Sequence, residues 1–92
     1  MGSGGEGRAR QAALTSEIRA EMGVRRWSGA ELASRAGMNQ NTLWRYLSDM
    51  RNMPVPVVIE IAQAFGWKFS ELVARADDRY QRGDFDLPES AG

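Results

Sequence analysis

A short stretch of the sequence gathers side chains that pair well with nucleobases. It carries two carboxamides, Gln40 and Asn41, followed by the indole of Trp44 and the guanidinium of Arg45. A carboxamide can pair with N6 and N7 of adenine, and a guanidinium with O6 and N7 of guanine or with a phosphate. The indole offers an apolar surface that suits a thymine methyl group or a sugar. These residue types predict base reading in the major groove of duplex DNA.

Neighbouring residues suit the phosphate backbone. Short hydroxyls and helix N-termini commonly contact phosphates, and arginines grip them with paired donors. The candidates for backbone contacts are Arg25, Arg26, Ser28, Asn39, Thr42 and Arg51. Other interpretations stay open: a charged loop for Arg25 and Arg26, a solvated helix start for the two carboxamides, and a core position for Trp44.

The composition argues against an enzyme. The chain contains no Cys and no His, which removes thiol nucleophiles, the usual zinc ligands and imidazole acid–base catalysis. The adjacent carboxylates Asp77 and Asp78 are interpreted as a solvated helix end. We therefore expect no catalytic residues, no metal and no cofactor.

The charge is balanced overall but unevenly distributed. The formal net charge is +0, yet residues 1–53 carry eight basic and five acidic residues, whereas residues 54–92 carry four and seven. One face of a polarised domain can meet phosphates although the whole chain is neutral. Zero net charge and the acidic C-terminal half support an alternative function, a protein-interaction module such as an antitoxin or adaptor.

The length of 92 residues predicts a single small domain. The longest uncharged apolar run, Met53–Ile59, is far shorter than the roughly 20 residues of a membrane span. The first ten residues have no apolar block typical of a signal peptide. We expect a soluble cytoplasmic protein with no membrane partner.

Periodicity and capping signals predict five helices and no sheet. Residues 1–7 are expected to be disordered, residues 8–82 to form the domain, and residues 83–92 to form a short acidic tail. The first helix is expected over Arg8–Met22, with Gly23 as its end. The fourth is expected to open at Pro56 and stop before Gly66, and the fifth to begin with Ser70 as its N-cap.

Two short helices joined by a tight turn form a predicted helix-turn-helix at about residues 27–48. Ser28 and Glu31 fit a capping box at the start of the first of these helices, and Gly37 ends it. Asn39 is the expected N-cap of the second, which runs to Leu47 or Ser48. At 100° per residue, one side carries Leu43, Tyr46 and Leu47, and the other carries Asn41, Trp44, Arg45 and Ser48, with Gln40 at the N-terminal tip.

These residues resemble the XRE family, the lambda-repressor-like helix-turn-helix domains of bacteriophage Cro and CI proteins and their bacterial relatives. The motifs that carry the resemblance are Glu31-Leu32-Ala33, residues 36–43, Arg45-Tyr46-Leu47, residues 61–66 and Ser70-Glu71-Leu72. The resemblance spans about residues 18–73. The chain departs from the family at Gly29, where members often carry Gln, and at Asp49, where Gly is usual.

The resemblance implies a compact five-helix bundle that binds duplex DNA with its third helix. It implies that Gln40 and Asn41 occupy base-reading positions, with Thr42, Trp44 and Arg45 close to a base or the backbone. It further implies a transcription regulator, by family habit a repressor, that acts as a homodimer on a near-palindromic operator. The candidates for the dimer surface are Ile59, Tyr80, Phe85 and Leu87; the alternative is a C-terminal cap packed on its own bundle.

Overall fold

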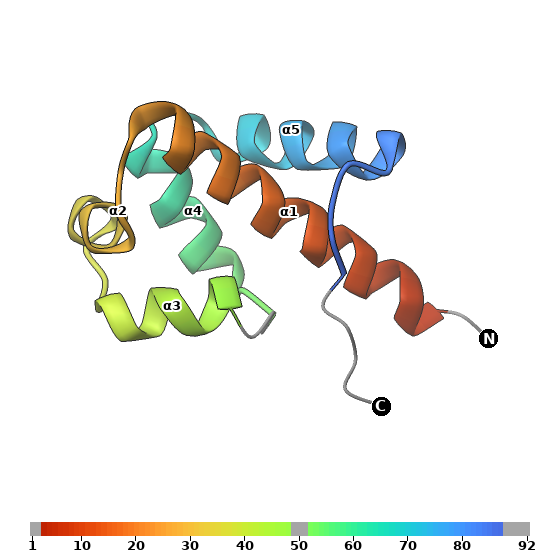
Figure 1. Cartoon of the computed structure of the whole chain (residues 1–92), viewed down its shortest axis with the longest axis horizontal. Helices are drawn as coiled ribbons and strands as arrows, with labels where there is room; N and C mark the ends of the chain where they lie inside the picture. The colour runs from red at the N-terminus through yellow and green to blue at the C-terminus, as the bar shows by residue number, and fades with distance from the viewer. Residues whose placement is uncertain (1–2, 49–51, 88–92) are drawn as a thin grey trace.

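The computed structural model describes residues 3–48 and 52–87, which fold into five α-helices and contain no strand (Figure 1). The helices are α1 (Ser3–Arg25), α2 (Gly29–Ala36), α3 (Gln40–Ser48), α4 (Val55–Ala64) and α5 (Phe69–Arg82). The expectation of an all-α, five-helix bundle is confirmed. None of the helices in the described residues is long and apolar enough to cross a membrane.

Every helix contributes one large, fully buried aliphatic side chain to a common core. These side chains are Ile18, Leu32, Leu43, Ile61 and Leu72. Since apolar surface removed from water is the main favourable contribution to folding, each helix is held through its own anchor. The core thereby fixes the orientation of α3, whose opposite side is left toward solvent.

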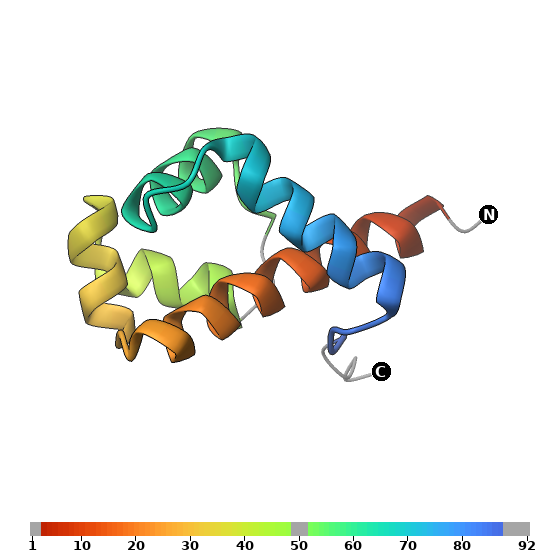
Figure 2. The same cartoon turned by 90° about the horizontal axis from the view of Figure 1, so that it is seen from above.

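The longest helix, α1, runs the length of the molecule, and the other elements are arranged along it. Helix α5 packs along α1 from about Gly7 to Glu17, whereas α3 lies beside the C-terminal part of α1 and α2 follows beyond its end (Figures 1 and 2). Helix α4 packs against both α2 and α5. This arrangement places α3 along one edge of the bundle.

Helix α1 is longer than the sequence predicts. It begins at Ser3 instead of Arg8, so residues 3–7, expected to be disordered, are helical; residues 1–2 lie outside the described residues. Extending an existing helix costs little, and the ion pair between Arg10 and Glu6 (3.0 Å) supports the added turn. The helix also passes Gly23 and stops at Arg25, because Arg26 adopts a left-handed conformation with φ of 59°.

The ends of α4 and α5 differ from the expectations by one or two residues. Helix α4 starts at Val55, one residue before the predicted Pro56. The N-cap of α5 is Lys68 and not Ser70, because the backbone turns from extended to helical at Lys68, whose carbonyl accepts the N–H of Leu72. Helix α5 ends at Arg82, and Gly83 follows it in the left-handed conformation.

Candidate nucleic-acid interface

The turn between α2 and α3 is set by local capping. Ser28 Oγ accepts the backbone N–H of Glu31 (3.1 Å), as predicted, but the Glu31 carboxylate accepts from Arg35 and does not close the capping box. Gly37 ends α2 in the left-handed conformation with φ of 71°. Asn39 Oδ1 then accepts the N–H groups of Asn41 (2.8 Å) and Thr42 (3.3 Å), which confirms it as the cap of α3.

Helix α3 divides into a buried and an exposed side. Leu43 and Leu47 are buried in the core, and Tyr46 packs partly against it. The four predicted base-reading residues, Gln40, Asn41, Trp44 and Arg45, are all exposed. The indole of Trp44 is 60 % exposed, so the alternative of a core position for this residue is wrong. Ser48, also expected on the outer side, is instead half-buried.

The candidate backbone contacts differ in their environments. Arg26, Ser28, Asn39 and Thr42 are exposed in or near the helix-turn-helix, where a phosphate can approach them. Arg51 lies outside the described residues.

Arg25 differs from the other candidates because its guanidinium is used inside the protein. Nε pairs with Glu21 (2.7 Å), and Nη2 donates to the carbonyl oxygen of Phe65 (2.7 Å) at the end of α4. The same group lies over the rings of Trp27, Phe65 and Trp67, at 4.9–5.7 Å from their centroids. This cation–π cluster joins the end of α1 to the α4–α5 connection, and it accounts for Arg25 without a phosphate.

Two features of the site were not found by sequence reasoning. Arg19 on α1 donates from Nη2 to the carbonyl oxygen of Leu47 (2.9 Å), near the C-terminal end of α3. A hollow of about 260 Å³ lies between Gly29 at the start of α2 and α3, where buried Leu43 and Leu47 and exposed Trp44 line it. Both join residues that are distant in sequence, and the chain carries no local signal for either, apart from the unusual glycine at position 29.

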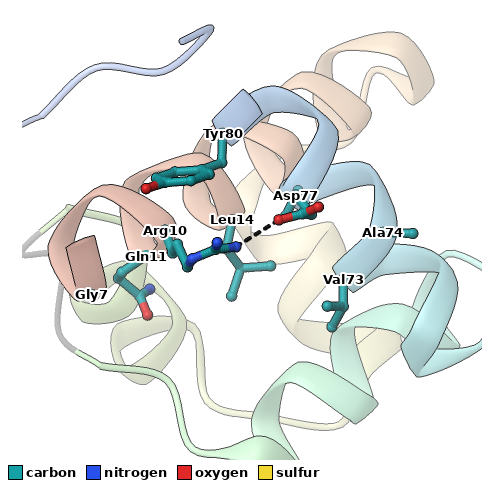
Figure 3. A pocket seen from close by; sticks show the side chains of 9 residues that line it. Gly7, Arg10, Gln11, Leu14, Val73, Ala74, Asp77 and Tyr80 are labelled. Carbon is teal, nitrogen blue, oxygen red and sulfur yellow. Dashed lines mark hydrogen bonds and ion pairs between the residues drawn. The ribbon is translucent and has the colours of Figure 1, made fainter. Parts of the chain in front are cut away.

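A second, larger hollow of about 470 Å³ lies between α1 and α5 (Figure 3). Leu14 and Val73 line it, and Arg10 spans it through a hydrogen bond to Asp77 of 2.6 Å. The pKa of Arg10 lies above its ordinary value, chiefly because of this hydrogen bond and secondly because of the one to Glu6. The Arg10 guanidinium also lies 4.2 Å from the ring centroid of Tyr80.

The candidates for a dimer surface occupy different environments. Tyr80 stacks on Phe85 of the same chain, with 6.1 Å between the centroids, as the C-terminal cap interpretation expects. Ile59 is half-buried, and Leu87 is 52 % exposed.

A comparison with protein families agrees with this geometry. The model of the Cro/C1-type HTH DNA-binding domain matches residues 17–78, more than half of the chain. The chain therefore belongs to this family of DNA-binding domains, and its resemblance to lambda-repressor-like helix-turn-helix proteins is confirmed. Neither a curated protein nor a solved structure matches it.

Proposed function

We propose that the protein is a transcription regulator that recognises a specific duplex DNA sequence with the outer side of α3. The observation that carries the proposal is the joint exposure of two carboxamides, an indole and a guanidinium on one helix of a Cro/C1-type domain. Among the bases, Gln40 and Asn41 pair best with adenine, and Arg45 pairs best with guanine. Arg26, Ser28, Asn39 and Thr42 contact the phosphates beside them.

The active form in this proposal is a homodimer that represses transcription. Helix α3 has nine residues and is therefore only about 13 Å long, enough for a few base pairs. A second copy in the next major groove, about 34 Å away, doubles the sequence that is read and makes the operator near-palindromic. A dimer bound across a promoter then blocks polymerase. Light scattering with and without DNA tests the dimer, and a monomer in both samples contradicts it.

Selection of bound sequences from random duplex DNA tests the central claim. On the selected duplex, Gln40→Ala and Arg45→Ala are each expected to weaken binding by about 1–3 kcal/mol, roughly 5- to 150-fold. Gln81→Ala and Arg82→Ala, with the same side chains exposed on the last turn of α5, are the matched controls and leave the affinity unchanged. Wild-type affinity in both α3 variants at moderate salt contradicts the proposal.

A second candidate function is a protein-interaction module, which the hollow between α1 and α5 favours. Its lining is mostly apolar, with Leu14, Val73 and Ala76 beside the Arg10–Asp77 pair. Mostly apolar hollows with a few polar groups are typical of binding sites. Stable retention of a protein partner, together with failure to retain any duplex from a random pool, favours this function over DNA binding.

A further inference from the structure

The hollow beside Trp44 is lined by both apolar side chains and carboxamides. Leu43, Leu47 and the indole of Trp44 line it from α3, and Gln40 and Asn41 also border it. The two leucines belong to the core, whereas the indole is 60 % exposed. The hollow is therefore a recess whose lining combines two buried leucines, an exposed indole and two exposed carboxamides.

Gly29 forms the α2 border of this recess. A Cβ atom placed on Gly29 would meet no other atom within 4 Å, so neighbouring atoms do not require a glycine there. Its φ is not in the left-handed region either, in contrast to Gly37 and Gly66. Glycine is a poor helix former, yet it occupies the first position of α2. Gly29 therefore leaves the α2 border of the recess without a side chain, although there is room for one.

We propose that this recess receives the C5 methyl group of a thymine, so that Gly29 and Trp44 together make the protein prefer thymine to a pyrimidine without that methyl. The inference rests on the proposed function. In the major groove, the thymine methyl is the apolar group that a base edge presents. The carboxamides that line the recess pair best with adenine, whose partner is thymine, so an A·T pair supplies both the polar and the apolar contacts.

Packing of Trp44 on a deoxyribose is the competing use of the same surface. It would be insensitive to the base, because every nucleotide carries the same sugar. Removal of the methyl group alone distinguishes methyl binding from sugar packing, because deoxyuridine keeps the base pairing and the sugar of thymidine.

The test uses the duplex that the protein selects from a random pool, with each thymine replaced in turn by deoxyuridine. We expect Kd to rise about fourfold at one position in each half-site, the effect of about one buried methyl group (0.8 kcal/mol). Trp44→Ala is expected to bind the thymine and deoxyuridine duplexes equally. Gly29→Leu, which fills the recess, is expected to lose the same discrimination.

The controls keep folding and binding apart. Trp44 is exposed and Gly29 has free space around it, so both variants are expected to show the wild-type circular dichroism spectrum. Ala30→Leu, at the adjacent exposed position that does not line the recess, retains the preference for thymine.

Each other outcome overturns a defined claim. Equal affinity of the wild type for thymine and deoxyuridine at every position overturns the methyl recess and leaves the proposed function standing. If the wild type shows this equal affinity but Trp44→Ala binds the duplex more weakly, Trp44 packs on a sugar instead. Discrimination that persists in Gly29→Leu overturns the role of Gly29. Failure to retain any duplex overturns the proposed function, and this inference with it.

Discussion

Arg19 on α1 donates a hydrogen bond from Nη2 to the carbonyl oxygen of Leu47, at 2.9 Å, and so connects the C-terminal end of α3 to α1. The last four carbonyl groups of a helix have no partner within it, and a cation there also interacts favourably with the helix dipole. Leu47 lies on the buried side of α3. The contact therefore fixes the proposed reading helix without occupying its outer side.

Arg19→Ala is expected to lower the free energy of unfolding by about 1 kcal/mol, the usual effect of losing one such hydrogen bond. It should also weaken DNA binding, because the end of α3 is then less well fixed. Urea unfolding and a binding titration measure the two effects. Arg8→Ala, at an exposed position of the same helix, is the control. Wild-type stability and affinity in Arg19→Ala would show that this contact does not position α3.

Gly37→Ala and Gly23→Ala are expected to change stability in opposite directions. Neither position has another atom within 4 Å of an added Cβ, so the backbone conformation alone decides the result. Gly37 has φ of 71°, where a side chain costs about 1–2 kcal/mol. Gly23 lies within α1, where alanine is better than glycine by about 0.5–1 kcal/mol. Thermal unfolding measures both, and a stabilised Gly37→Ala would contradict the assigned turn.

Local signals made most of the helix-turn-helix predictable from the sequence. The caps at Ser28 and Asn39 and the end at Gly37 depend on residues at most four positions away, so the chain itself displays them. The outer side of α3 followed from helical periodicity. The start of α1 could not be predicted in this way. Its first turn is supported by an ion pair and by the packed helix that follows, whereas the glycine-rich composition of this segment suggests disorder.

Contacts between distant residues could not be predicted. Arg25 and Arg26 are adjacent and identical in type, and only the fold shows that the first one reaches Phe65, 40 positions away. The same holds for Arg19 and Leu47, which are 28 positions apart. The recess at Gly29 needs α2 and α3 in place before it exists.

Arg25→Gln and Arg26→Gln are expected to separate stability from DNA binding. Arg25 is engaged with Glu21, Phe65 and three aromatic rings, so its loss should cost about 2 kcal/mol of unfolding free energy. Arg26→Gln should leave stability within about 0.5 kcal/mol, as for most surface substitutions.

The salt dependence of binding then distinguishes the two arginines. If Arg26 contacts a phosphate, Arg26→Gln reduces the slope of log K against log salt by about one, whereas Arg25→Gln keeps the wild-type slope once it is folded. Binding titrations at several salt concentrations measure this slope. A reduced slope in Arg25→Gln would assign a phosphate contact to Arg25 and contradict this prediction.

Glu17 and Arg79 form a largely buried ion pair between α1 and α5, with 2.6 Å between Oε1 and Nε and side chains only 10 % and 19 % exposed. Arg79 also pairs with Asp84 (3.0 Å), which ties the segment after α5 to the bundle. Removal of one partner leaves the other charge poorly solvated. Glu17→Gln and Arg79→Met are therefore each expected to destabilise the protein by about 2–3 kcal/mol.

The double variant Glu17→Gln/Arg79→Met is expected to cost less than the two single variants together, with a coupling energy above about 1 kcal/mol. The matched control is the exposed pair of Glu31 and Arg35, with side chains 44 % and 51 % exposed, where the coupling should stay below about 0.5 kcal/mol. Urea unfolding of the two double-mutant cycles measures both values. Either single variant already breaks the ion pair, so the second substitution cannot lose it again and the two effects should not add. Additive effects at Glu17 and Arg79 would therefore mean that each residue stabilises the α1–α5 contact by packing alone.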